Sequence, residues 1–145
     1  MKREETIDFN IKAAWHAIAR LYNAEANSND MTTSIGFILL NIDSEKGEAA
    51  TKIAPLLGLE ARSITRTLNN MEEKGLIYKE KVTKDKRGIR VFLTDLGKEK
   101  KEISRKTVLN FNFQMQALID PDELKTFFSV IQQINKIIDE KKIIF

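Results

Sequence analysis

Several residue types that common function classes require are scarce or missing from this chain of 145 residues. It has no cysteine, which excludes structural disulfides, thiolate metal sites and thiol-based oxidation sensing, and which is typical of a cytosolic protein. Its single histidine, His16, rules out a histidine-rich metal site, although carboxylates alone could hold a hard cation. We therefore expect no zinc and no cofactor.

Long hydrophobic runs and catalytic motifs are missing as well. No stretch of about 18 uncharged apolar residues occurs, and residues 1–5 lead into a charged amphipathic segment instead of an apolar signal core. No nucleophile with a base and no phosphate loop is visible, and solvation explains the loop carboxylates Asp43, Glu45 and Glu48. The sequence predicts a cytoplasmic protein that is not an enzyme and does not bind a membrane.

The net charge of +3 is modest, but it is distributed unevenly. Residues 1–50 carry 5 Lys or Arg against 8 Asp or Glu, residues 51–106 carry 15 against 8, and residues 107–145 carry 4 against 5. A basic middle between mildly acidic ends predicts that the middle meets a polyanion. The apolar content of 42% is enough for the core of one domain.

Apolar periodicity predicts two helices in the first part of the chain. Residues 6–26 carry apolar side chains at steps of three and four, with two aromatic residues beside them: Ile7, Ile11, Ala14, Trp15, Ile18, Leu21 and Tyr22. A second helix, capped by Thr33 or Ser34, turns four residues inward: Ile35, Ile38, Leu39 and Ile42. The second helix should contribute to the core.

A helix-turn-helix pattern follows. A short helix over residues 51–57 ends at Gly58, which allows a sharp turn, and a longer helix runs from about Ala61 to Lys74. The inner stripe of this longer helix is Ile64, Leu68 and Met71, and its remaining positions include Arg62, Ser63, Thr65, Arg66, Asn69 and Asn70. Arg can bond guanine in two places, Asn can bond adenine in the same way, and Ser and Thr reach phosphates or base edges. This face suits a DNA major groove, and the alternative is an ordinary solvated helix face.

A charged hairpin comes next. Gly75 ends the helix, and residues 76–83 and 89–94 read as two strands joined by Lys84, Asp85, Lys86, Arg87 and Gly88. Ile89, Val91 and Leu93 should point inward, with Arg90 and Phe92 pointing away. A tip arginine such as Arg87 can enter a narrow minor groove, oriented by Asp85, although a plain polar turn explains the tip equally well.

These residues resemble the MarR-type (multiple antibiotic resistance regulator) winged-helix transcription factors over essentially the whole chain. The wing signature of that family is matched by Asp85, Arg87, Val91, Leu93, Thr94 and Gly97. The helical part is matched by residues 57–59, Ser63 to Arg66, Leu68, Glu72, residues 74–77, and Thr32 or Thr33. The resemblance implies a mainly α fold with a small β-hairpin wing (α+β). It implies a DNA-binding lobe over residues 32–94 and a helical dimerisation region over residues 6–26 and 95–145, in one chain of residues 1–145.

The chain departs from the family at Glu60, where a serine or similar small helix cap is common. A carboxylate suits the helix dipole but repels phosphate, so Arg62 has either a phosphate or a base as its partner. Thr65 and Arg66 are assigned to bases, Arg87 to the minor groove, Asp85 to holding Arg87, and Leu93, Thr94 and Gly97 to the scaffold.

The C-terminal part predicts two long helices. The first starts at Asp95 and runs to residue 118, with Lys98, Lys100, Lys101, Arg105 and Lys106 in its first half; residues 108–116 alternate with period two but are interpreted as helix because no turn interrupts them. Asp120 and Pro121 start the second helix, whose apolar stripe is Leu124, Phe127, Phe128, Ile131, Ile134 and Ile138. These stripes exceed what one small core can use. They are either core or a homodimer interface that includes Ile7, Ile11, Phe128, Ile131, Ile138, Ile143, Ile144 and Phe145.

The function implied is a homodimeric, nucleoid-associated prokaryotic repressor. Two recognition helices about one DNA turn apart would read a pseudo-palindromic double-stranded operator. An anionic or aromatic effector would change operator affinity by about 1–3 kcal/mol. The candidate effector residues, which ordinary core packing also explains, are Trp15, His16, Arg20, Tyr22 and Phe37. The alternatives are a winged-helix protein-interaction module without operator binding and a ligand-responsive activator.

Overall fold

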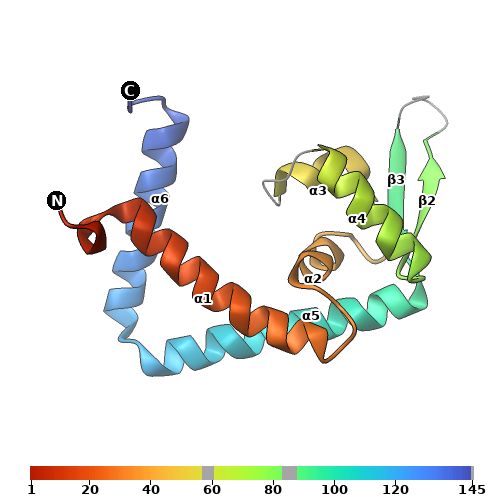
Figure 1. Ribbon diagram of the computed structural model, residues 1–145, viewed down its shortest axis with the longest axis horizontal. Helices are drawn as coiled ribbons and strands as arrows, with labels where there is room; N and C mark the ends of the chain where they lie inside the picture. The colour runs from red at the N-terminus through yellow and green to blue at the C-terminus, as the bar shows by residue number, and fades with distance from the viewer. Residues whose placement is uncertain (57–60, 83–87, 145) are drawn as a thin grey trace. The chain divides into compact units, whose positions relative to one another are not determined.

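The computed structural model describes residues 1–56, 61–82 and 88–144, and it forms two compact units, residues 1–107 and 108–145. The first unit contains the 3-10 helix η1 (Arg3–Glu5), α1 (Ile7–Asn27), α2 (Thr33–Leu40), β1 (Glu48–Ala49), α3 (Ala50–Leu56), α4 (Ala61–Glu73), β2 (Ile77–Lys81) and β3 (Ile89–Leu93). Helix α5 (Asp95–Leu118) begins in the first unit and continues into the second, which also contains α6 (Pro121–Asp139) (Figure 1). The predicted mainly α fold with a small hairpin is confirmed.

Helix α2 begins one residue earlier than its sequence pattern suggested. The hydroxyl of Thr32 accepts a hydrogen bond from the backbone N–H of Ile35 at 3.2 Å, so Thr32 is the cap, and not Thr33 or Ser34. The hydroxyl of Thr33 is engaged elsewhere, because it donates to Oδ1 of Asn23 on α1 at 2.5 Å. One threonine therefore caps α2 while the next fastens it to α1.

The sheet has three antiparallel strands in the order β1-β3-β2. In the hairpin, Ile77 pairs with Leu93 and Lys81 with Ile89. The third strand, β1, is a difference from the sequence interpretation, which treated residues 43–48 as a loop: Glu48 pairs with Val91. Glu48 and Ala49 are too few to show an alternating strand pattern, and they form a strand only because they pair with β3.

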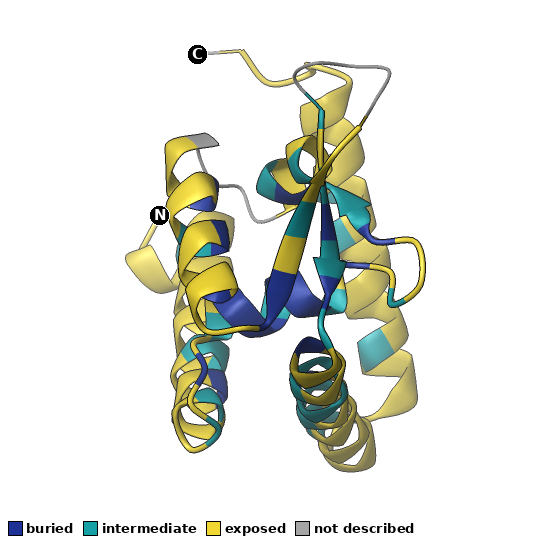
Figure 2. Ribbon diagram, turned by 90° about the vertical axis from the view of Figure 1, so that its right-hand side faces the viewer, coloured by how far each residue is buried: buried dark blue, intermediate teal, exposed yellow. Residues whose placement is uncertain are grey.

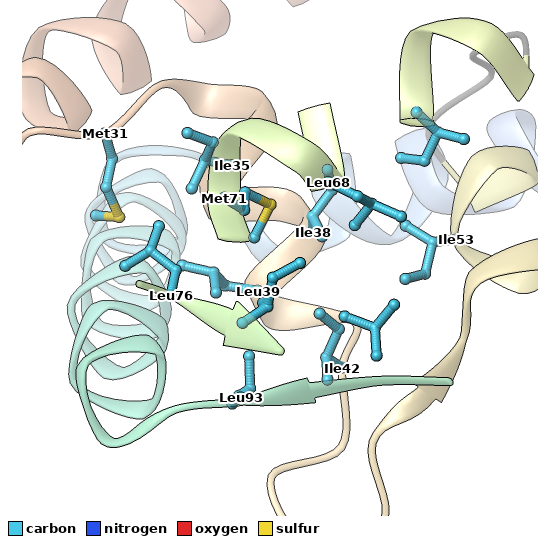
Figure 3. Packing of buried hydrophobic residues seen from close by; sticks show 13 residues of the cluster. Met31, Ile35, Ile38, Leu39, Ile42, Ile53, Leu68, Met71, Leu76 and Leu93 are labelled. Atoms are coloured by element: carbon cyan, nitrogen blue, oxygen red, sulfur yellow. The ribbon is translucent and has the colours of Figure 1, made fainter. Parts of the chain in front are cut away.

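The hydrophobic core of the first unit lies between α2, α4 and the hairpin (Figures 2 and 3). The predicted inward residues of α2 (Ile35, Ile38, Leu39 and Ile42) and of α4 (Ile64, Leu68 and Met71) are all buried. They pack with Met31, Ile53, Leu76, Ile77, Val91 and Leu93. Each such side chain contributes about 1.5–3 kcal/mol when fully buried, so this cluster holds α4 in place.

One predicted inward residue of the hairpin is outside the core. Val91 is fully buried and Leu93 nearly so, but Ile89 is 42% exposed. Alternation places all three side chains on one face of β3, but only Val91 and Leu93 on that face are covered. The outer end of the hairpin therefore projects from the lobe.

The junction between β3 and α5 explains the Leu-Thr-x-x-Gly motif. The hydroxyl of Thr94 donates to the carbonyl of Gly75 at 2.6 Å and accepts from the N–H of Gly97 at 3.0 Å. A Cβ at Gly97 would collide with the backbone carbonyl of Leu76. The motif thus fastens the start of α5 to the turn after α4, the scaffold role expected for Thr94 and Gly97.

Both C-terminal helices form as the sequence predicted. The stretch 108–116 is helical throughout α5, despite its period-two pattern. The carboxylate of Asp120 accepts from the N–H groups of Asp122 and Glu123 and caps α6, with Pro121 at the first helical position. Local capping signals were sufficient to predict this boundary.

Candidate nucleic-acid interface

Helix α4 presents a polar outer face whose orientation follows from its buried stripe. Ile64, Leu68 and Met71 are 5%, 4% and 0% exposed, which fixes the rotation of the helix about its axis. The six predicted DNA-binding residues of α4 are all exposed: Arg62, Ser63, Thr65, Arg66, Asn69 and Asn70. The first acidic residues of the described helix are Glu72 and Glu73, at its C-terminal end. Its first three turns can therefore approach a polyanion without repulsion from their own side chains.

The last turns of α4 are connected to the hairpin. The Nζ atom of Lys79 on β2 donates to Oδ1 of Asn69 at 2.6 Å and lies 3.9 Å from a carboxylate oxygen of Glu72. Arg62 and Arg66 make no hydrogen bond or ion pair with any other residue that the structure describes. The predicted DNA-binding residues of α4 thus differ in their hydrogen bonding. Arg62 and Arg66 are exposed and have no bonding partner among the described residues, whereas Asn69 is bonded to Lys79.

Arg90 has structural partners. Its Nε donates to the carbonyl of Lys46 at 2.6 Å and its guanidinium also reaches the carbonyl of Gly47 at 3.3 Å. These bonds tie β3 to the turn before β1. The side chain points away from the core, as expected for its strand position, and it is half-buried. Its inclusion among DNA contacts stays a prediction.

The tip of the hairpin lies outside the described residues. This applies to the predicted contacts Lys84, Asp85, Lys86 and Arg87, and also to Glu60 ahead of α4. The strands are closed just below the tip by a hydrogen bond from the N–H of Val82 to the carbonyl of Gly88 at 2.9 Å. This bond is the last pairing of the two strands among the described residues.

Most cations in the first half of α5 are bonded within the first unit. Lys100 donates to the carbonyl of Asn29 at 2.8 Å, Lys101 donates to that of Ile42 at 2.5 Å, and Lys98 lies 3.7 Å from Glu45. Arg105 makes two bonds of 2.8 Å with Glu102; these bonds lower the pKa of the Glu102 carboxyl and raise the pKa of Arg105. The charge count of residues 51–106 therefore overstates the charge offered to a partner.

A groove of about 590 Å³ lies in the first unit and contains two of the predicted effector residues, Trp15 and Phe37, whose rings stack at 5.8 Å. Tyr22 packs edge-on to Phe37 at 6.1 Å, and burial raises the pKa of its hydroxyl. His16 and Arg20 are exposed on α1 and do not line the groove. Its other lining residues, which the sequence did not indicate, are Ala19, Asn23, Thr32, Thr33, Ser34, Asn41 and Leu56.

The predicted dimer residues are mostly exposed. The exposed fractions are 61% for Ile7, 44% for Ile11, 52% for Phe128, 57% for Ile138, 54% for Ile143 and 91% for Ile144. Ile131 is half-buried and Phe145 lies outside the described residues. Large exposed apolar residues that the interface prediction did not include are Leu21, Phe113, Leu118, Phe127 and Val130. Their number favours a partner for these helices over a purely intramolecular core.

The described residues contain neither a membrane-spanning helix nor a cluster of metal-ligating side chains. None of the helices there is long and apolar enough to span a bilayer. No cluster of three or more potential metal-ligating side chains occurs in residues 1–56, 61–82 or 88–144.

The helix-turn-helix, the hairpin behind it and the Thr94 junction define the class of this chain: it contains a winged helix-turn-helix lobe. Residues 31–89 match the model of the MarR family. This match covers the winged-helix lobe, and it agrees with the resemblance drawn from the motifs.

Relatives agree with this assignment. The chain is 29% identical over 90 residues to the HTH-type transcriptional regulator TtmR of Methylorubrum extorquens (strain PA1), covering 62% of this chain and 46% of that protein. It is 28% identical over 78 residues to the uncharacterized HTH-type transcriptional regulator YdgJ of Bacillus subtilis (strain 168), covering 54% and 48%. The matches thus span about half the length of these curated relatives.

Solved structures share the fold. The S. aureus MepR–DNA complex has a TM-score of 0.81 at 18% identity and covers 90% of this chain and 97% of MepR. The PcaV transcriptional regulator from Streptomyces coelicolor, in complex with its natural ligand, has a TM-score of 0.79 at 20% identity, covering 94% and 96%. The shared fold therefore extends beyond the winged-helix lobe.

Proposed function

We propose that this chain is a sequence-specific DNA-binding transcriptional regulator. The observation that carries the proposal is the outer face of α4, where Arg62 and Arg66 stand exposed beside Ser63 and Thr65 with no acidic residue before Glu72. Arginine forks and short hydroxyl side chains match base edges and phosphates in a major groove. MepR, whose fold this chain shares, has been solved in complex with DNA, and this supports the proposal.

The mechanism that fits best is steric repression by a homodimer at a pseudo-palindromic operator. Helix α4 would enter the major groove while Arg87 at the hairpin tip enters the adjacent minor groove. Two-fold symmetry would present the second α4 to the next half-site about one DNA turn away. The role is binding in the cytoplasm, without catalysis.

Selection of bound fragments from genomic DNA, followed by titration of a selected duplex, tests the proposal. We expect an enriched pseudo-palindrome, and an affinity that falls by about 10³-fold or more between about 50 and 200 mM salt as counterions are released. Replacing Arg62 and Arg66 together by Gln should abolish enrichment, whereas Lys12→Gln on α1, which also removes a cation, should not. A salt-independent affinity or no enriched sequence favours the protein-interaction alternative.

The groove at Trp15 and Phe37 supports a second part of the proposed function, which is binding of a small anionic or aromatic effector. Stacked rings provide an apolar wall, and Asn23, Ser34 and Asn41 supply polar groups around it. Since Trp15 is the only tryptophan, its fluorescence reports on the groove directly. Benzoate should quench it saturably and change operator affinity by about five- to 150-fold, more than neutral benzyl alcohol does. Identical weak quenching by both compounds contradicts effector binding here, and tighter operator binding with benzoate would favour an activator.

A further inference from the structure

One side chain of the hairpin is bonded to a side chain of α4, the candidate DNA-reading helix. Lys79 on β2 donates from Nζ to Oδ1 of Asn69 at 2.6 Å, and the same ammonium lies 3.9 Å from Glu72. Asn69 and Glu72 are one turn apart on α4, and both reach Lys79 on β2. Helix α4 lies beside the hairpin (Figure 1). The pair therefore links the candidate DNA-reading helix directly to the wing.

The position of Lys79 is fixed by the strand register. It pairs with Val91, which is fully buried, so its side chain starts on the core-facing side of the hairpin. Only 22% of the Lys79 side chain is exposed. Its aliphatic stem runs out along the edge of the core, and the partly desolvated ammonium finds acceptors on α4. A buried stem of this kind holds the charged end in one place.

The chemistry of the pair determines which way the Asn69 amide points. An ammonium has three donors and no acceptor, so only the amide oxygen can face it. The Nδ2 group of Asn69 must then point away from Lys79. None of the other residues that the structure describes accepts a hydrogen bond from it. Asn69 therefore turns its oxygen toward Lys79 and its amide nitrogen away from β2.

We infer that Lys79 is a positioning residue that restricts Asn69 to reading hydrogen-bond acceptors on a base. This inference rests on the proposed DNA-binding function. A free asparagine bonds adenine at N7 and N6, which requires both its oxygen and its nitrogen. Because Lys79 holds the oxygen toward β2, oxygen and nitrogen cannot both face one base, and the nitrogen alone matches the acceptor edges of guanine or thymine. The adenine preference expected from an asparagine on this face is thereby removed by a residue outside the helix.

The hydrogen bond itself can be tested without DNA. In a ¹⁵N–¹H spectrum, assigned with Asn69→Ala, the side-chain amide of Asn69 should shift in Lys79→Met. It should not shift in Lys81→Met, which removes the same charge from an exposed position on the same strand. An amide that is unchanged in Lys79→Met overturns the link between the two residues.

The reading role is tested by selection from randomised duplexes. The wild type should favour guanine or thymine over adenine at one half-site position by at least about fivefold, and Asn69→Ala should lose that preference. Lys79→Met should raise adenine at this position by about fivefold or more relative to the wild type, because the amide can then turn. Lys79→Arg, which still donates to Asn69, should restore the wild-type profile, and Lys81→Met should weaken binding equally for all sequences.

The results of the selection distinguish a wrong positioning role for Lys79 from a wrong DNA-binding function. If the wild type selects an operator and Lys79→Met leaves the base profile unchanged, the positioning role is wrong and the proposed function stands. If Lys79→Met weakens binding to all sequences equally, as is expected of Lys81→Met, the positioning role is wrong as well. If the wild type selects no duplex at all, the proposed function is overturned and the reading role with it.

Discussion

Lysine and arginine residues that look equivalent along the chain have different fates in the fold. Lys100 and Lys101 are bonded to backbone carbonyls of Asn29 and Ile42, which lie 71 and 59 residues away in the chain. Arg66 is exposed on α4, with no hydrogen bond or ion pair to another residue in the described part of the chain. At the scale of single residues, the basic stretch therefore separates into cations that hold the lobe together and cations that remain for a partner.

Arg66→Ala should lower operator affinity by about 1–3 kcal/mol and relax base preference at one half-site position. The reason is the loss of a two-pronged contact to a base edge. Fluorescence anisotropy with a selected duplex and single-base variants measures both effects. Lys101→Met serves as a contrast, because we expect it to lower stability through its lost bond to Ile42 while leaving base preference intact. If Arg66→Ala weakens every sequence equally, Arg66 contacts phosphate and not a base.

Asp43 predicts a pH dependence of stability. The backbone N–H groups of Lys46 and Glu45 donate to its carboxylate at 2.7 and 2.8 Å and lower the pKa of Asp43. A carboxyl whose pKa is lowered by folding stabilises the folded state above its unfolded pKa of about 3.9, and that stability is lost as pH falls through the lowered pKa. Urea unfolding of the wild type and Asp43→Ala should differ at neutral pH and converge in acid. A constant difference at both pH values contradicts this assignment.

At the scale of elements, the turns that place β1 and the hairpin depend on two glycines with positive φ. Gly47 has a φ of 67° and Gly75 a φ of 71°. A Cβ at Gly47 would collide with the carbonyl of Val91 and lie 2.8 Å from the ring of Phe92, whereas a Cβ at Gly75 would meet nothing within 4 Å. Both positions therefore require a left-handed backbone conformation, but only Gly47 is closely packed against other atoms.

Substitution of these two glycines by alanine should distinguish the cost of a strained backbone from the cost of a steric clash in the free energy of unfolding. Gly75→Ala should lower the free energy of unfolding by about 1–2 kcal/mol, the cost of a left-handed conformation alone. Gly47→Ala should lower it by about 2–5 kcal/mol, because displacement of the β1 turn is added. Denaturant titration of the two variants measures the difference. Equal losses would show that the close approach at Gly47 relaxes without cost.

The elements themselves were predicted to different degrees, for a physical reason. The buried stripe of α4 and the cap at Asp120 are predictable, because periodicity and capping are properties of neighbouring residues. The scaffold role of Thr94 and Gly97 follows only from the family resemblance, because their partners Gly75 and Leu76 are about 20 residues away in the chain. The strand β1 was missed because Glu48 and Ala49 become a strand only by pairing with Val91 and Arg90 of β3. Ile89 was placed inward by alternation, which does not report where the covering helices end.

At the scale of the whole molecule, the exposed apolar side chains of α1 and α6 predict association. Phe128 and Ile138 are 52% and 57% exposed on α6, and Ile7 is 61% exposed on α1. Large apolar groups of this kind are seldom left in water when they are numerous. A homodimer that buries them would also give the proposed regulator its second recognition helix.

Sedimentation measurements test this prediction. The wild type should sediment as a dimer at micromolar concentration, and the double substitution Phe128→Asp with Ile138→Asp should sediment as a folded monomer. Its operator affinity should fall by about 100-fold or more, because the paired half-site is lost. Ser129→Asp, on the opposite side of α6, should remain dimeric. A monomeric wild type removes the argument for a pseudo-palindromic operator.

The sequence by itself determined the helices, the helix-turn-helix and the hairpin, because those depend on patterns between near neighbours in the chain. Only the tertiary structure decided which polar side chains are bonded within the chain and which remain free to contact a partner. Lys101 and Arg90 are bonded to carbonyls from remote segments, and the Asn69 oxygen is bonded to Lys79 across the gap between helix and strand. Such partners are set by the packing of distant elements, and no local pattern of residue types encodes them.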